Sequence, residues 1–237
     1  MDIVKIPAAR SSAAEGENAG ASPQSDLLRI NEIFFSLQGE TSRTGLPTVF
    51  VRLTGCPLRC GYCDTAYAFH EGLTRNVGDV VAEVSRHRTR YVCVTGGEPL
   101  AQKSCLVLLT RLADAGFSVS LETSGAIDIA PVDIRVSRIV DIKTPGSGEV
   151  KKNRWSNIAL LTGHDEVKFV LCDEDDYLWA VGILREHQLD AKCPVLFSPV
   201  SGKLSAAALA EWILRDQLPV RMQIQLHKIL WNDTRGK

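Results

Sequence analysis

The sequence of 237 residues lacks any apolar run near the roughly 20 residues that a membrane-spanning helix needs. It also lacks an excess of charge, because 27 basic and 28 acidic side chains leave a formal net charge of -1. This balance argues against a basic surface for nucleic acid or for an anionic membrane. The seven cysteines are too few for a disulfide scaffold, and no apolar secretory leader is visible. We therefore expect a protein of the reducing cytoplasm that binds neither membrane nor nucleic acid.

The first 26 residues differ in composition from all that follow. From Ala8 to Ser25, every residue except Arg10 is Ala, Ser, Gly, Glu, Asn, Pro or Gln. Such a segment cannot bury enough apolar surface to offset the entropy lost on ordering. We predict a disordered N-terminal extension over residues 1–26 and a single domain over residues 27–237.

From Leu27 onward, short β-branched or apolar runs alternate with helical patterns. Strands are predicted at 28–35, 48–53, 91–95, 118–122, 139–143, 166–171, 195–198 and 221–226, and helices at 77–87, 103–115, 176–187 and 205–217. This alternation is typical of an α/β fold with a mostly parallel sheet, open or partly closed as a barrel. Chemistry in such folds gathers at the carboxyl ends of the strands.

Three of the seven cysteines, Cys56, Cys60 and Cys63, follow the predicted strand that ends at Leu53. Their CxxxCxxC spacing in one loop can bring three thiols to one metal centre. Structural zinc usually has four protein ligands, and no second CxxC or HxxxH pair is present. Three cysteines suit a four-iron cluster whose fourth iron takes a non-protein ligand. The remaining cysteines are expected to be buried as small apolar side chains: Cys93, Cys105, Cys172 and Cys193.

A second motif, TGGEP at residues 95–99, begins at the end of the predicted strand 91–95. Its two glycines let the backbone approach a ligand closely, and Glu98 can accept hydrogen bonds from a ligand's ammonium group. Together with the aromatic residue before the last cysteine, the two motifs resemble the radical S-adenosylmethionine (SAM) superfamily. The resemblance implies an incomplete, TIM-like β/α barrel, a 4Fe–4S cluster, and SAM bound at the open iron as the source of a 5′-deoxyadenosyl radical.

Five further segments narrow the resemblance to the 7-carboxy-7-deazaguanine synthase family: IFFSLQGE at 33–40, CDT at 63–65, LETSG at 121–125, VKFV at 167–170 and QLHK at 225–228. That family converts 6-carboxy-5,6,7,8-tetrahydropterin to 7-carboxy-7-deazaguanine with loss of ammonia, as a carbon–nitrogen lyase of queuosine biosynthesis. It uses Mg²⁺ in addition to the cluster and SAM. The resemblance also implies a homodimer and a reducing electron donor such as flavodoxin.

The resemblance assigns expected roles to particular residues. Cys56, Cys60 and Cys63 would hold the cluster, and Thr65 would bind Mg²⁺. The residues expected around SAM are Tyr62, Cys63, Asp64, Gly97, Glu98, Thr123, Ser124, Asp141, Ile142 and Lys143. Those expected around the pterin are Leu37, Gln38, Gly39, Glu40, Arg52, Thr95 and His227. Arg52 is chemically apt, because a guanidinium group pairs with a carboxylate through two parallel hydrogen bonds.

Several of these residues also have plainer interpretations. Thr65 can cap a helix, Arg52 can lie on a strand surface, and His227 can be a packed histidine. Glu122, at a predicted strand end, can bind backbone alone. For the whole chain, the rivals are a glycyl-radical-enzyme activase, a zinc-binding interaction module and a tRNA-binding protein, the last disfavoured by the charge. The LQGE, CDT and QLHK segments favour the pterin enzyme.

Overall fold

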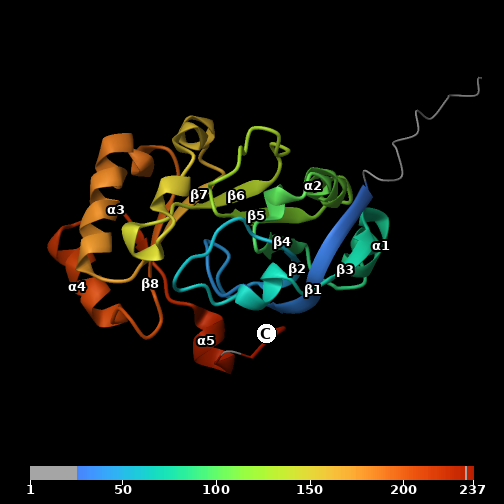
Figure 1. The fold of residues 1–237 in the computed structure, drawn as a ribbon, viewed down its shortest axis with the longest axis horizontal. Coiled ribbons are helices and arrows are strands. Elements are labelled where there is room, and N and C mark those ends of the chain that lie inside the picture. The colour runs from blue at the N-terminus through green and yellow to red at the C-terminus, as the bar shows by residue number, and fades with distance from the viewer. Residues whose placement is uncertain (1–25, 233) are drawn as a thin grey trace, which may run out of the picture.

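The computed structural model describes residues 26–232 and 234–237, so the extension predicted over residues 1–26 lies outside it except for Asp26. Strands and helices alternate along the described chain (Figure 1). The strands are β1 (Leu27–Leu37), β2 (Pro47–Leu53), β3 (Leu73–Asn76), β4 (Tyr91–Gly96), β5 (Ser118–Thr123), β6 (Ser137–Asp141), β7 (Glu166–Leu171), β8 (Val195–Pro199) and β9 (Arg221–Met222). The α-helices are α1 (Val77–Val84), α2 (Ser104–Asp114), α3 (Glu174–His187), α4 (Ala206–Arg215) and α5 (Leu226–Trp231).

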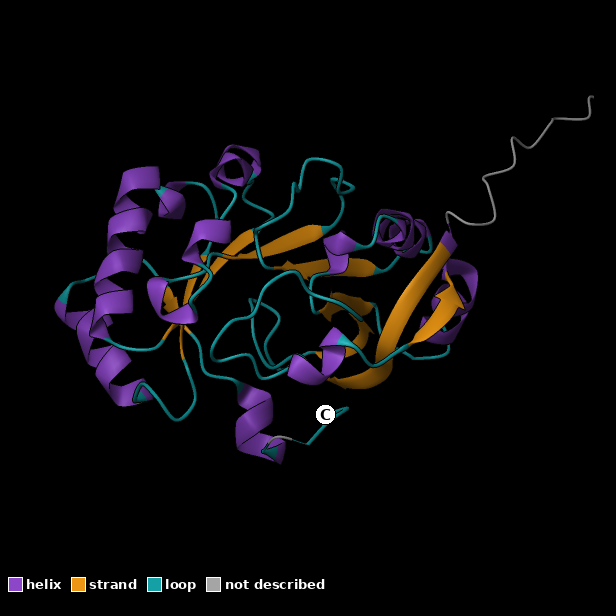
Figure 2. Ribbon diagram, viewed as in Figure 1, coloured by secondary structure: helices purple, strands orange, loops and turns teal. Residues whose placement is uncertain are grey.

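The strands form one sheet in the order β3-β1-β2-β4-β5-β6-β7-β8-β9. In the order of the sheet, each neighbouring pair from β2–β4 to β8–β9 is parallel. β1 runs antiparallel to both of its neighbours, β2 and β3. The sheet curves, with most helices on its outer side and loops gathered within the curve, and α5 lies at the open side (Figure 2). Since the two end strands do not pair in the described structure, the expected incomplete β/α barrel is confirmed.

The antiparallel direction of β1 corrects one expectation about the site. Leu37, the last residue of β1, pairs with Pro47, the first residue of β2. The loop after β1 therefore starts at the end of the barrel opposite to the carboxyl ends of the parallel strands. The loop lies within the curve of the sheet. Arg43 donates to the carbonyl of Ser118, at the start of β5, at 2.9 Å, and Gln38 Nε2 lies 3.4 Å from Glu122, near the end of β5.

Three segments differ from the sequence-based predictions. The edge strand β3 was not predicted, because its four residues are mostly exposed and carry no apolar run. The run predicted as strand 139–143 ends at Asp141, since Lys143 turns to donate its backbone N–H to Asn153 Oδ1 at 2.9 Å. The strand predicted at 221–226 shortens to β9, and α5 begins at Leu226, whose N–H donates to Gly39 O at 3.1 Å.

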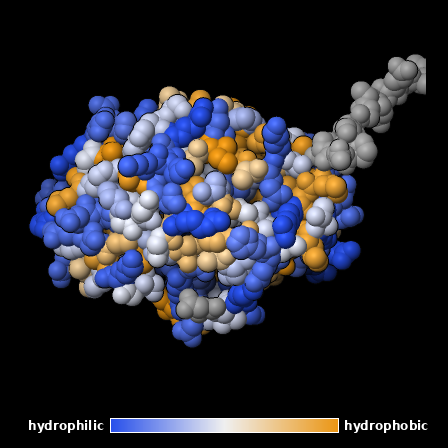
Figure 3. Space-filling model, viewed as in Figure 1, coloured by the Kyte–Doolittle hydropathy of each residue, from blue (hydrophilic) through white to orange (hydrophobic). Residues whose placement is uncertain are grey.

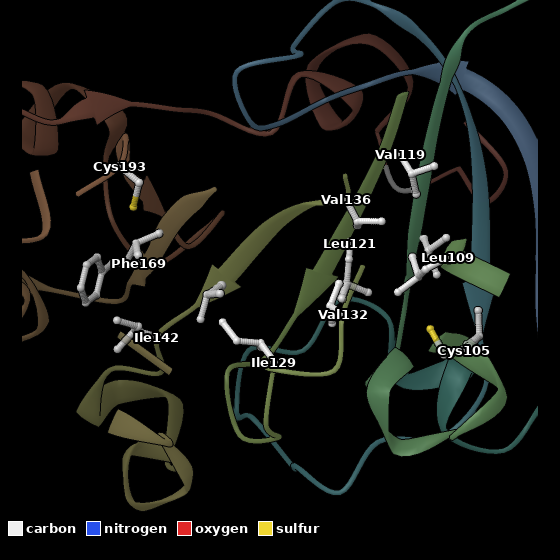
Figure 4. Close-up of a cluster of buried hydrophobic side chains, with 14 of the residues drawn as sticks. Cys105, Leu109, Val119, Leu121, Ile129, Val132, Val136, Ile142, Phe169 and Cys193 are labelled. Carbon is white, nitrogen blue, oxygen red and sulfur yellow. The ribbon is translucent and has the colours of Figure 1, made fainter. Parts of the chain in front are cut away.

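The core lies between the sheet and the helices outside it. α2 buries Cys105, Leu108, Leu109 and Leu112, whose three- and four-residue spacing places them on one face of the helix. Figure 4 shows part of this layer, which runs from Leu109 to Phe169. The four single cysteines are buried, as expected. On the face shown in Figure 3, hydrophobic side chains are scattered among hydrophilic ones, and none of the described helices is long and apolar enough to cross a bilayer.

Candidate active site

One cavity of about 280 Å³ opens inside the curve of the sheet. It is lined by eighteen of the residues that the sequence singles out: Leu37, Gln38, Gly39, Glu40, Arg52, Cys56, Cys60, Tyr62, Cys63, Asp64, Thr65, Thr95, Gly97, Thr123, Ser124, Asp141, Lys143 and His227. They come from the loop after β1, from the ends of β2, β4, β5 and β6, and from α5. The residues expected around SAM and those expected around the pterin therefore meet in one space.

The loop that carries the three cysteines is fastened to the TGGEP turn. Glu98 donates its backbone N–H to Gly55 O at 2.8 Å. Gly97 packs so closely that a Cβ atom there would lie 2.2 Å from Gly55 O and 2.9 Å from Cys56 Cβ. On its other side, Gly61 N–H donates to Ser147 O at 3.0 Å. The glycine at position 97 is thus needed for the two motifs to approach each other.

The donor set fits an iron–sulfur cluster better than a single zinc ion. Cys56, Cys60 and Cys63 are free, half-buried thiols on the same cavity. Zinc binds thiolate at about 2.3 Å, so a tetrahedral site would hold the sulfur atoms within about 4 Å of one another. In the part of the chain that the structure describes, no three His, Cys, Asp or Glu side chains converge in this way. A four-iron cluster places each cysteine on a different iron, which allows wider spacing.

Lys143 supplies positive charge beside the thiols. Burial raises the pKa of the Cys60 thiol, and the nearby Lys143 ammonium group opposes that rise. Lys143 lies 2.9 Å from Asp141 Oδ2. Burial alone would lower the pKa of Lys143, but attraction to Asp141 and Cys60 outweighs burial and raises it. The amine therefore stays charged next to the thiolates that would bind iron.

Two residues expected around SAM do not line the cavity. Ile142 packs into the hydrophobic core, so its side chain cannot contact a ligand in the cavity. Glu98 is fully buried beneath the cavity, and its carboxylate accepts hydrogen bonds from Ser124 N at 2.7 Å, Thr123 Oγ1 at 2.9 Å and Leu100 N at 3.0 Å. Glu98 does not line the cavity, and each of its oxygens already accepts at least two hydrogen bonds from the protein, so its carboxylate supports the turn that lines the site.

Asp141 has an unused oxygen at this site. Its Oδ1 atom is buried and has no hydrogen-bond partner among the described residues, while Oδ2 binds Lys143. A buried carboxylate oxygen without a donor is costly, so it favours a ligand that brings a hydroxyl or amine.

The plainer interpretations of Thr65, Arg52 and His227 hold only in part. Thr65 precedes a short 3₁₀ helix, but its hydroxyl makes no capping bond and lies 3.8 Å from Cys63 Sγ. Arg52 is mostly buried and donates from Nε to Glu32 at 2.8 Å while lining the cavity. His227 is packed, because a Cβ on Gly39 would lie 2.3 Å from its Nδ1 atom, yet it too borders the cavity.

The structure adds two charged residues that the site predictions lacked. Glu122 accepts from Thr95 Oγ1 at 2.9 Å and lies 3.4 Å from Gln38 Nε2, so it does more than bind backbone. Lys168 forms an ion pair with Glu40 inside the cavity. Burial alone would lower the pKa of Lys168, but Glu40, Asp141 and Glu122 raise it above its usual value. A lysine inside the apolar run VKFV was the signal for this partner.

The sequence matches known proteins over most of its length. The model of the Radical SAM superfamily matches residues 50–198. A 7-carboxy-7-deazaguanine synthase from Chlorobaculum tepidum is 46% identical over 213 residues, which cover 88% of this chain and 97% of the relative. Another, from Koribacter versatilis, is 43% identical and covers 88% of this chain and 100% of the relative.

The chain belongs to the 7-carboxy-7-deazaguanine synthase family. The fold agrees, because the crystal structure of QueE from Escherichia coli matches with a TM-score of 0.71, 25% identity, and coverage of 85% of this chain and 95% of that one. Streptococcus suis SuiB, at 13% identity and a TM-score of 0.54, shares the fold alone. The chain is thus a radical SAM enzyme, with an iron–sulfur cluster and SAM as cofactors. Membership of this family favours the pterin-enzyme interpretation over the glycyl-radical activase, the zinc-binding module and the tRNA-binding protein.

Proposed function

We propose that this cavity converts 6-carboxy-5,6,7,8-tetrahydropterin to 7-carboxy-7-deazaguanine with loss of ammonia. The observation that supports it most is that the cysteine loop and the LQGE loop line the same 280 Å³ cavity. A substrate held by the LQGE loop would therefore lie next to a cofactor held by the cysteine loop. Such proximity is the main requirement when a cofactor supplies the difficult chemistry.

In this proposal, Cys56, Cys60 and Cys63 hold the cluster, and Thr65 contributes to the Mg²⁺ site. A hydroxyl is a weak ligand, so water and the substrate carboxylate would have to complete the coordination of Mg²⁺. Gly97, Ser124 and the backbone after the third cysteine would hold SAM. When bound, the cluster and SAM supply the 5′-deoxyadenosyl radical that removes a hydrogen atom from the pterin.

The protein's own side chains bind and orient the pterin. Arg52 offers its guanidinium group to the substrate carboxylate, since Glu32 already fixes its Nε atom. Gln38 and Glu122 present an amide and a carboxylate to the donor–acceptor edge of the ring. Burial raises the pKa of Glu40, but Lys168 outweighs that effect, and the net shift is downward. Glu40 thus remains an ionised acceptor for the pterin's N–H groups.

The synthase acts on a small molecule and needs a reductant, as radical SAM enzymes do. We propose a flavodoxin-type protein as the electron donor and a homodimer as the assembly, and the family resemblance supports both. We also propose the reducing cytoplasm as its compartment, because seven free cysteines would not persist unpaired where disulfides form.

The test is anaerobic reconstitution with iron and sulfide, followed by incubation with SAM, dithionite, Mg²⁺ and the carboxytetrahydropterin. Mass spectrometry should detect carboxydeazaguanine together with 5′-deoxyadenosine. Deoxyadenosine without deazaguanine would retain the radical chemistry and reject the substrate. Neither product, from a protein that contains zinc in place of iron, would reject the whole assignment.

A further inference from the structure

The segment QLHK contains two residues that the proposed site does not use, Gln225 and Lys228. Gln225 lines the cavity at the start of α5. Its amide nitrogen, Nε2, lies 3.0 Å from Glu40 Oε1 and 3.0 Å from Asp64 Oδ2. One side chain thus joins the LQGE loop to the cysteine loop.

Each of the two carboxylates also contacts a lysine. Lys168 of β7 pairs with Glu40, and Lys228 of α5 lies 3.3 Å from Asp64 Oδ2. The result is a continuous row of polar side chains, Lys168–Glu40–Gln225–Asp64–Lys228, across one wall of the cavity. Two negative charges and two positive charges balance within the row, so a neutral residue is required at its centre.

The chemistry of a primary amide explains why glutamine occupies that centre. Its NH₂ group carries two hydrogens and can donate one to each carboxylate. A glutamate there would add a third negative charge and no donor, whereas a methionine of similar length would leave both contacts empty. Hydrogen bonds to charged groups are stronger than neutral ones, so this bridge resists separation of the two loops.

The segment that carries Gln225 is itself fixed to the LQGE loop. Gln223 is buried and binds the backbone of Thr41 twice, accepting from N at 2.9 Å and donating to O at 2.7 Å. Leu226 N–H donates to Gly39 O at 3.1 Å. These bonds hold one loop only. Among the contacts of residues 223–228 in the described structure, Gln225 and Lys228 both reach the cysteine loop through Asp64 Oδ2, but only Gln225 also binds Glu40 of the LQGE loop.

We propose that Gln225 is a positioning residue that couples the pterin-binding loop, residues 38–41, to the end of the cysteine loop, residues 63–65. This inference rests on the proposed function. Because the bridge sets the distance between the two loops, it keeps the pterin within reach when SAM is cleaved. Without it, SAM would be cleaved with the pterin misplaced. The radical would then be quenched by an electron from the reductant and a proton from solvent, so deoxyadenosine would form without an equivalent amount of product.

The test compares Gln225→Met with a control, Gln188→Met, which removes the amide of an exposed glutamine that does not line the cavity and leaves the bridge intact. In the reconstituted enzyme, Gln225→Met should lower kcat/KM for the pterin about tenfold or more, the effect of one lost charge-assisted hydrogen bond. It should also raise the ratio of deoxyadenosine to deazaguanine. Gln225→Glu should do so more strongly, because of repulsion from Glu40 and Asp64. Gln188→Met should leave the ratio near that of the wild type.

A second readout needs no cluster. Hydrogen exchange of the cluster-free protein should accelerate in both loops, residues 38–46 and 61–66, when Gln225 is changed. It should accelerate in the first loop alone when Gln223 is changed. If Gln225→Met does not fold, Gln225→Asn serves instead, since its amide is too short to reach both carboxylates.

The outcomes separate the two proposals. A wild-type enzyme that makes no deazaguanine rejects the proposed function. A wild-type enzyme that makes it, with a Gln225 variant whose product ratio is unchanged, rejects the coupling. Faster exchange in only one loop of the Gln225 variant also rejects it.

Discussion

Changing Glu98 tests most directly whether its carboxylate holds the TGGEP turn in place beside the cavity. Both of its oxygens accept from a backbone N–H, Oε1 from Leu100 at 3.0 Å and Oε2 from Ser124 at 2.7 Å. The change Glu98→Gln replaces one oxygen with an NH₂ group. Whichever way the amide turns, that group faces a backbone donor that cannot reverse its direction, so one buried N–H loses its acceptor.

The expected cost follows from these contacts. Losing a hydrogen bond to a charged group costs about 1.5–3 kcal/mol, and a buried donor left unsatisfied costs about 1–3 kcal/mol. We expect the free energy of unfolding to fall by about 3–5 kcal/mol, a large part of the ~5–15 kcal/mol typical of a domain. Urea unfolding of the cluster-free protein measures the loss. Glu211→Gln, on the exposed side of α4, is the control and should change stability by less than about 0.5 kcal/mol.

The opposite result would be informative. A loss below about 1 kcal/mol, accompanied by weaker SAM binding, would mean that Glu98 contacts the cofactor directly, as the sequence motif suggests. In that case the buried network with Thr123 and Ser124 would not be what holds this turn in place.

Three further changes test other parts of the structure. Gly97→Ala should destabilise the protein by about 1–3 kcal/mol and lower iron uptake, because the new Cβ would lie 2.2 Å from Gly55 O; unchanged iron content would contradict this. Cys60→Ala should prevent assembly of a full cluster, measured as iron and sulfide per chain, and full iron retention would remove it as a ligand. Asp165→Asn should cost about 3–5 kcal/mol at pH 7, since Asp165 binds Arg138 through Oδ1 at 2.8 Å and Oδ2 at 2.6 Å. Burial raises the pKa of Asp165, but Arg138 outweighs burial and the net shift is downward, so this stability exists above about pH 4 and is lost as the pH falls. Urea unfolding across pH should show the wild type and the variant converging in acid, and a constant difference would contradict the ion pair's role.

The cysteine loop and the TGGEP turn could be predicted from the sequence because both are local. Each motif directly follows a parallel strand, and the carboxyl ends of adjacent parallel strands lie at the same edge of the sheet. The burial of the four single cysteines could also be predicted from their local sequence, since an isolated Cys among apolar residues is usually buried.

The direction of β1 could not be predicted, because apolar periodicity defines a strand but not its orientation. Gln38 therefore reaches the cavity by a route that no strand-end argument contains: a loop that enters the barrel from the opposite end. Lys168 and Glu122 were hidden for a related reason, since a charged residue in a strand can face either side of the sheet. The contact of Gln225 with Glu40 spans 185 residues, a separation that no local pattern encodes.

That separation has a consequence for how the protein is made. One wall of the cavity joins residues 38–41 to residues 223–228, so it can form only after almost the whole described chain has left the ribosome. The strands from β1 to β8 can pair as they are synthesised. Until residues 223–228 are added, however, the wall next to the cysteine loop is incomplete. Iron inserted before that point would meet a solvent-open site. The wall that shields the cluster site from solvent is therefore complete only after α5 has been synthesised.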